Sequence, residues 1–412
     1  MSKAAPHLSH PEYPIARELM SVMIENSQQP GEGNEAFIQS MSDILQRYPL
    51  PFTVHRDPMY TNRAALAVDI GDPEDEQVLA AVSHSDVVGV EGQHWTTVPW
   101  KLKETDDEWF GRGTCDTHGT GVSMLLAGLD PDIQQKLRSV RKKVTVVFTY
   151  DEEATSPEFS MRGARLAAGL LGNPKIITAD RFIAGEPTEL DGKITPMRAH
   201  KGRFLAHFNV TAPHAGHVSN TSQNALMAGS TIVHEISEYA RMLHYGSAAD
   251  VEAQIYNPPF STAQVSAADV KKGDYSTAPD FARFTIDMRT LPFVHRERVD
   301  QVIDLVRSQH LQNGEQVTLE IVKDGEGSMT PADADIVKIA EGATGRQARG
   351  FNGGDEGRIF RNSANMQGVT MGPGDLVYAH QPDERIRIAS IFEGSKLYRQ
   401  MYLQAAGFSP ES

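Results

Sequence analysis

At 412 residues, the chain is longer than one ordinary hydrophobic core, so we expect two domains. Hydrophobic residues make up 40% and charged residues 23%, close to globular averages, which excludes a disordered or fibrous protein. The net charge of −15 argues against a nucleic-acid partner, because phosphate binding needs a basic surface.

The N-terminal segment has no apolar run of signal-peptide length, since Arg17 and Glu18 interrupt its first apolar cluster. No stretch reaches the roughly 20 apolar residues that a membrane helix needs. A single cysteine, Cys115, excludes an internal disulfide framework and fits a reducing compartment. We therefore expect a cytoplasmic protein without a membrane partner.

The first part of the chain predicts an α/β fold. Apolar residues at helical spacing indicate two amphipathic helices near the start, the second around residues 37–45. Uniform apolar runs then predict strands buried on both faces of a sheet, at 64–70, 78–82, 144–149 and 181–184. Helical patterns lie between several of them, at 119–129 and 161–171.

After Lys201 the pattern changes to a compact α+β insertion. It reads as strand, helix, strand, helix and strand, with a Pro/Gly/Ser-rich passage before Pro279. The predicted elements are 205–210, 224–243, 282–288, 296–309 and 316–322. From Pro331 the α/β pattern resumes and ends in a helix near 391–403.

Polar residues follow the predicted buried strands, where open α/β sheets usually bind their ligands. His84 comes directly after one strand, although a single histidine there is commonly only structural. Asp86, two residues later, could accept a hydrogen bond from the second ring N–H of His84 and so orient it as a ligand. Asp116 follows a glycine-rich turn and precedes a helix, so it is a candidate ligand or an N-cap.

The acidic run Asp151-Glu152-Glu153 also follows a buried strand. Three consecutive carboxylates repel one another unless cations or protons relieve them, so the run is either a ligand segment or an exposed acidic loop. In an extended segment successive side chains alternate, so Glu152 and Glu153 would then point in opposite directions.

Glu186 ends another strand, and His380 lies in the run Ala-His-Gln-Pro-Asp-Glu. Together with the earlier residues they form the mixed nitrogen and oxygen ligand set of catalytic zinc sites. With two metal ions, one carboxylate would bridge them and a water between them would attack.

Five ordered motifs resemble the aminoacylase/carboxypeptidase family of di-zinc metallohydrolases, which includes acetylornithine deacetylase and succinyl-diaminopimelate desuccinylase. They are H-x-D, G-R-G-x-x-D, D-E-E, G-E-P-T and G-P-G with A-H-Q-P-D-E, and they extend from His84 to Glu384. The runs S-M-R-G-A-R, R-A-H-K-G and D-x-R-x-L-P are most similar to the acetylornithine deacetylase branch.

The resemblance implies two metal ions per subunit, zinc or alternatively cobalt or manganese. Asp116 would bridge the two ions. His84 and either Glu153 or Glu186 would bind individual ions, and His380 would complete the second. Glu152 would be the general base and Asp86 would orient His84. The implied metal ligands are His84, Asp116, Glu153, Glu186 and His380.

The resemblance further implies a mixed-sheet, zinc-exopeptidase-like catalytic domain, residues 1–198 with 325–412. Residues 199–324 would form an inserted ferredoxin-like dimerisation and lid domain. Arg289 would grip the substrate carboxylate through its planar guanidinium. In a homodimer one lid histidine would reach the partner's active site; His214 and His217 are both candidates, and the Gly-His-x-Ser context favours His217.

Three residues depart from the family pattern: His118 replaces a lysine, Ser276 an asparagine and Glu356 an aspartate. They affect the expected substrate rather than the metals. The implied activity is deacylation of a small N-acyl amino acid such as N-acetylornithine, in arginine biosynthesis. Alternatives are desuccinylation of diaminopimelate, dipeptide or carboxypeptidase cleavage, and a non-catalytic metal-containing binding protein. The last is disfavoured because a scaffold would not need Glu152.

Overall fold

The computed structural model describes residues 9–156, 158–214, 216–219, 223–246, 252–271, 276–309, 311 and 313–410. The chain divides into two compact units. The first comprises Met1–Arg198, Thr330–Arg349 and Asp355–Ser412, and the second Ala199–Met329 and Gly350–Gly354. The sequence predicted no signal peptide in the N-terminal segment. The first residues of that segment, 1–8, lie outside the described residues. Among the described helices, none combines the length and apolar character needed to cross a membrane.

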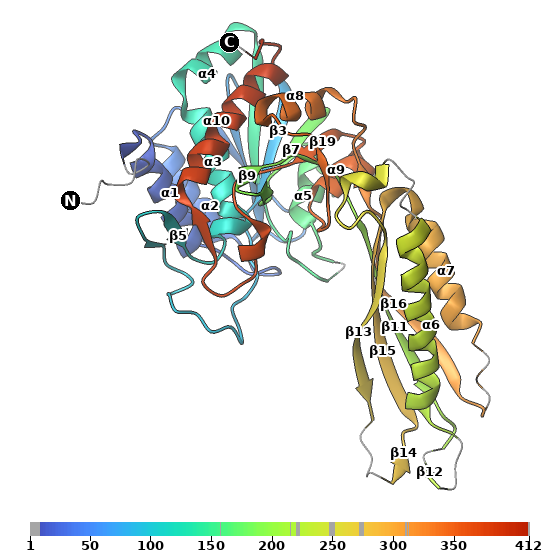
Figure 1. Ribbon diagram of the computed structural model, residues 1–412. Coiled ribbons are helices and arrows are strands. Elements are labelled where there is room, and N and C mark those ends of the chain that lie inside the picture. Colours follow the sequence, from blue (N-terminus) through green and yellow to red (C-terminus); the bar gives the residue numbers. More distant parts are fainter. Residues whose placement is uncertain are drawn as a thin grey trace. The chain divides into compact units, whose positions relative to one another are not determined.

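The first unit is built on a mixed β-sheet (Figure 1). Its strands include β1 (Phe52–Arg56), β2 (Ala64–Ile70), β3 (Glu76–His84), β6 (Lys142–Thr149), β7 (Arg181–Ala184) and β19 (Gln367–Thr370). They lie in the order β1-β2-β6-β3-β7-β19, and Met197 of β10 (Met197–His200) pairs with Thr370. The pairs β6–β3, β3–β7 and β7–β19 are parallel, so their carboxyl ends share one edge.

Helices cover both faces of this sheet because its strands are apolar on both sides. In β2, for example, Leu66 and Val68 join one core while Ala65 and Ala67 join the other. The first core includes α1 (Tyr13–Glu25), α2 (Glu35–Leu45), α3 (Gly119–Leu129), α4 (Pro131–Ser139), α8 (Asp335–Thr344) and α10 (Ile388–Ala405). The second includes α5 (Arg162–Ala167) and α9 (Gly357–Ala364). The predicted mixed α/β fold is confirmed.

In its described residues, the second unit contains a four-stranded antiparallel sheet that packs against two α-helices. In chain order its elements are β11 (Gly202–Thr211), α6 (Ala225–Gly246), β13 (Thr262–Val270), β15 (Phe281–Thr290), α7 (His295–Arg307) and β16 (Gln316–Gly325). The strand order β13-β15-β11-β16 makes this a ferredoxin-like arrangement. Along β11, Phe204 and Phe208 are buried in one core with Ile232 of α6 and Val299 of α7, and alternate residues are half-buried.

The strand β13 and the end of α5 are two of the differences from the prediction. The strand β13 was not predicted, because its residues are small or polar and mostly exposed at the edge of the sheet, which leaves no apolar run. The helix expected over 161–171 is α5, which ends at Ala167. Gly169 follows with a φ of +74°, a left-handed conformation that stops a helix.

Candidate active site

Three parallel strands of the first unit bring polar side chains to one edge of the sheet. His84 is the last residue of β3, and Glu152 and Glu153 follow β6 closely. Glu186 comes two residues after the end of β7. Because β3 pairs with both β6 and β7 in parallel, these side chains converge at the carboxyl ends of the strands.

Asp116 reaches the same place from the loop that precedes α3. This loop passes close to itself at Gly113, where φ is +85° and a Cβ would lie 2.6 Å from the ring of His118, so only glycine fits. The Asp116 side chain is buried, and its two oxygens face different histidines. Oδ1 lies 3.1 Å from Nε2 of His84, and Oδ2 lies 3.3 Å from Nε2 of His380.

Two groups of possible metal ligands therefore share Asp116. In each group the ligand atoms lie within 4.8 Å of one another. The first group is fully buried, and its members are His84, Asp116 and Glu186. The second reaches the surface at His380, whose side chain is 50% exposed and whose Nε2 lies 2.7 Å from Oε1 of Glu153; its members are Asp116, Glu153 and His380.

The electrostatics indicate an excess of negative charge. Burial, followed by repulsion from Asp116, raises the pKa of Glu186 well above its usual value. Burial also raises the pKa of Glu152 well above normal, and repulsion from Glu153 and other carboxylates adds to this despite nearby His84. Hydrogen bonds to Asp116 and Glu153 raise the pKa of His380 to about 10. Divalent cations would compensate this charge, and the imidazole and carboxylate donors suit zinc.

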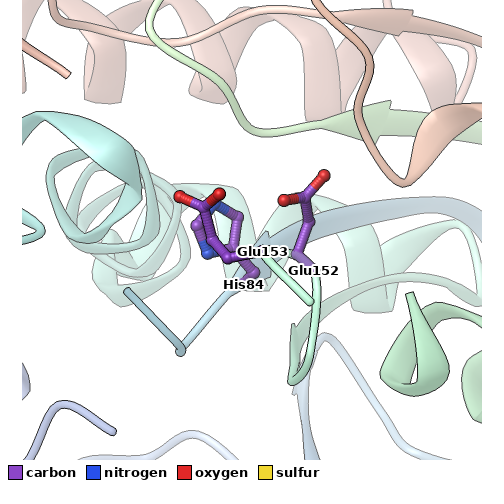
Figure 2. Close-up of side chains that lie close together, drawn as sticks. All are labelled: His84, Glu152 and Glu153. Atoms are coloured by element: carbon purple, nitrogen blue, oxygen red, sulfur yellow. The ribbon is translucent and has the colours of Figure 1, made fainter. Parts of the chain in front are cut away.

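Glu152 and Glu153 face the same space, which differs from the expected alternation. Figure 2 shows both carboxylates on one side of their segment, beside the ring of His84. Ligand atoms of all three side chains lie within 4.8 Å of one another. The segment is bent rather than extended, and Asp151 has a φ of +58°. The alternation of an extended strand therefore does not apply here.

The carboxylate of Asp86 binds backbone N–H groups, and it is the backbone carbonyl of Asp86 that contacts the histidine ring. Nδ1 of His84 donates to the backbone carbonyl of Asp86 at 2.8 Å, whereas the nearer carboxylate oxygen is 3.8 Å away. This corrects the prediction that the carboxylate accepts the ring N–H. The carboxylate instead accepts the backbone N–H groups of Glu152 at 3.1 Å and Glu153 at 3.0 Å. Asp86 thereby fixes the segment that carries both glutamates.

A model of the peptidase family M20/M25/M40 matches residues 80–404. The chain belongs to this family. It is accordingly a metal-dependent hydrolase.

Named members resemble this M20 family chain along most of its length. Acetylornithine deacetylase from Myxococcus xanthus is 26% identical over 336 residues, 79% of this chain and 80% of that protein. An M20 family metallo-carboxypeptidase from Sulfolobus solfataricus has a TM-score of 0.69 and 16% identity, covering 95% of this chain and 99% of that chain. A dinuclear metal-binding M20 peptidase from Bacillus subtilis has a TM-score of 0.66 and 13% identity, covering 95% and 98%. These two likenesses establish the fold.

The remaining predicted site residues of this family member belong to the second unit. Arg289 lies on β15, is partly exposed, and has its Nε 3.4 Å from the Asp287 carboxylate. His217 lies on β12 (Gly216–His217), which pairs with β14 (Thr277–Ala278), and its ring is exposed. His214 is exposed as well, and its backbone N–H donates to Gln223.

Of the three departures from the family pattern, two lie in the first unit. Glu356 is buried and accepts a hydrogen bond from Oγ1 of Thr149 at 2.7 Å. Burial raises its pKa to about 7. The ring of His118 lies 2.8 Å from Oγ of Ser27, and burial lowers its pKa to about 3. Ser276 lies in the second unit, where its carbonyl accepts the N–H of Val218.

Proposed function

We propose that this M20 family hydrolase removes an acyl group, in the first place acetyl, from an N-acyl amino acid such as N-acetylornithine. The observation that carries the proposal is the placement of Asp116, with one carboxylate oxygen toward each of two histidines and Glu152 facing the same space. The likeness to the deacetylase from Myxococcus xanthus favours an N-acetyl substrate. The proposed setting is the cytoplasm and arginine biosynthesis.

Two divalent cations, zinc or alternatively cobalt or manganese, are part of the proposal. One would be held by His84, Asp116 and Glu186, and the other by Asp116, Glu153 and His380. The donor set and the charge excess support this arrangement. When bound, such ions polarise the acyl carbonyl and acidify a water molecule.

The chain's own residues supply the remaining steps. Glu152 takes the proton of the attacking water and passes it to the leaving nitrogen. Its carboxylate lies beside His84 and Glu153, where it can hold a proton between these two transfers. In the proposed homodimer, residues 199–324 act as dimerisation and lid domain. Arg289 binds the α-carboxylate of the substrate, and His217, or else His214, completes the partner's site.

A substrate panel tests the proposal. The purified protein is stripped with a chelator, reloaded with zinc, cobalt or manganese, and assayed for amine release. The substrates are N-acetylornithine, N-succinyl-diaminopimelate and a dipeptide. We expect no turnover without metal, and a kcat/KM for N-acetylornithine at least about tenfold above the others, or about 1.4 kcal/mol. A preference for the dipeptide would overturn the proposed deacetylase activity and favour peptidase activity.

A further inference from the structure

Glu384 is a buried carboxylate that grips the backbone beside Asp116. It lies four residues after His380, and its side chain is 1% exposed. Oε1 accepts the backbone N–H groups of Cys115 at 2.9 Å and Asp116 at 3.0 Å. Oε2 accepts a hydrogen bond from Nη1 of Arg112 at 2.6 Å. Both oxygens are therefore occupied, and Arg112 compensates the buried charge.

These contacts restrict how Asp116 can turn. The two N–H groups belong to successive peptides, and their hydrogen bonds to one oxygen hold the backbone that leads into Asp116. The carboxylate of Asp116 must present one oxygen toward His84 and the other toward His380. A small rotation of this backbone would move both oxygens, because both are bonded to the same Cγ.

Glu384 itself belongs to the loop that carries His380. His380 and Asp383 have φ values of +62° and +53°, a conformation that is costly for residues other than glycine. The loop is held by Gln93, whose Nε2 donates to the carbonyl of His380 at 2.9 Å, and by Thr96, whose N–H donates to Asp383 at 2.9 Å. Nη2 of Arg112 donates to Oε1 of Gln93 at 2.6 Å. Arg112 thus connects Glu384 to the residue that holds His380.

Asp86 provides an independent parallel in the same site. It lies two residues after His84 and accepts the backbone N–H groups of Glu152 and Glu153. Each of the two histidines is therefore followed by a buried carboxylate that binds the backbone of another ligand segment. Glu384 follows His380 and binds the backbone N–H of Asp116, and both of these residues belong to the group Asp116, Glu153 and His380.

We propose that Glu384 is a positioning residue that aligns Asp116 with His380, so that the group Asp116, Glu153 and His380 can bind a metal ion. The inference rests on the proposed two-metal function of the site. It assigns to Glu384 a task that the side chain performs without touching metal or substrate.

The test is Glu384→Gln, with metal binding measured by calorimetry on the metal-free protein. The glutamine amide has only one acceptor oxygen. It can accept from the two backbone N–H groups or from Arg112, and its NH2 group then faces the other donor. We expect one of two zinc ions to bind about 10- to 100-fold more weakly, as for other residues that orient ligands, while the other binds normally. In the metal-free variant the Cys115 and Asp116 amides should exchange hydrogen faster than in the wild type.

A matched control is Glu189→Gln. Glu189 is also buried in the first unit, accepts the backbone N–H of Gly374 at 3.2 Å, and pairs with Nη2 of Arg387 at 2.9 Å. It belongs to neither metal group, so both zinc affinities should match the wild type. Equal weakening in the two variants would mean that loss of any buried charge perturbs the site, and would overturn the assignment.

Other outcomes separate this inference from the proposed function. If wild-type protein binds no metal, the proposed function fails. If the wild type binds two ions and Glu384→Gln binds both normally, only the inference fails. Should Glu384→Gln not fold, Glu384→Asp is measured in the same way, since aspartate keeps the charge but is one methylene shorter and so weakens the contacts with the Cys115 and Asp116 N–H groups. Loss at one site then supports the inference, and unchanged affinities overturn it.

Discussion

At the scale of single residues, the site is organised by which atoms each carboxylate faces. Asp116 faces two histidines, whereas Asp86 and Glu384 turn their oxygens to backbone N–H groups. Burial and repulsion between the carboxylates raise the pKa values of Glu152 and Glu186. Side chains of one chemical type therefore have different tasks, set by their partners.

Glu152→Gln tests the proposed base. The amide keeps the shape of the side chain but cannot accept a proton, so turnover should fall by at least about 10²-fold. Two metals per chain should still bind, as measured by metal analysis. Glu153→Gln is the contrasting variant, since it should weaken one metal and regain activity with added zinc. Normal turnover of Glu152→Gln, or loss of its metals, would contradict this division of roles.

Arg289→Lys tests the proposed carboxylate grip. Lysine keeps the charge but loses the planar fork, so kcat/KM should fall by roughly one to three orders of magnitude, about 1.4 kcal/mol per tenfold. Metal content should not change. Arg283→Lys is a matched control on the same strand and face, six residues away, and should be near normal. Equal kinetics for the two variants would remove Arg289 from the substrate site.

At the scale of elements, a buried polar network holds the bend that carries Glu152 and Glu153. Oδ1 of Asp151 accepts the N–H of Gly31 at 2.8 Å, and Oδ2 accepts from Nη1 of Arg63 at 2.8 Å. This fixes a residue whose φ of +58° is unfavourable alone. The preceding Tyr150 donates through its hydroxyl to Asp57 at 2.6 Å. Hydrogen bonds of Tyr150 and Asp151 therefore stabilise the bend where it leaves β6.

Asp57→Asn probes this network through pH. Burial opposes ionisation of Asp57, but hydrogen bonds from Arg162, Tyr150 and two backbone N–H groups outweigh it and lower its pKa to about 2. In the unfolded chain this carboxyl has a pKa of about 3.9. The stabilisation of the fold by ionised Asp57 is therefore present above that pH and is lost as the pH falls through about 2. The variant should lose at least about 2 kcal/mol of unfolding free energy at pH 7, and less as the pH falls.

Urea denaturation of the metal-free protein between about pH 7 and about pH 2 measures the difference. Tyr150→Phe removes one hydrogen bond and leaves the ion pair of Asp57 with Arg162, so its loss should be smaller. A loss for Asp57→Asn that is the same at every pH would show that the network acts by packing alone.

At the scale of the whole molecule, the groups of the proposed mechanism are divided between two units. The first unit contains all proposed metal ligands and Glu152, and the second contains Arg289, His214 and His217. Each unit has its own hydrophobic core. Under the proposed homodimer, one chain lends the other a group, which makes the quaternary state part of the activity.

Subunit mixing tests this proposal. His217→Ala and Glu152→Gln subunits are each expected to be nearly inactive alone. Some mixed dimers would carry one intact composite site, so amine release should partly recover after subunit exchange. If only His214→Ala mixtures recover, His214 is the donor. The absence of recovery in both mixtures, despite verified exchange, would contradict a site completed by the partner.

The sequence by itself predicted the mixed α/β fold, because apolar runs and helical spacing are local properties of the chain. It also singled out the motifs that contain His84, Asp116 and His380, of which His84 lies at a strand end and the other two lie outside the strands. It did not predict β13, because an edge strand of small and polar residues leaves no apolar pattern.

Only the tertiary structure decided how the acidic residues divide their tasks. Glu384 and the N–H of Asp116 are separated by 268 residues, so no local pattern predicts their hydrogen bond. The bend at Asp151 likewise depends on Arg63, which lies 88 residues earlier in the chain. Local spacing specifies which side chains reach the sheet edge. Contacts between distant segments specify where their oxygens point, because each orientation is set by a hydrogen-bond partner brought there by the fold.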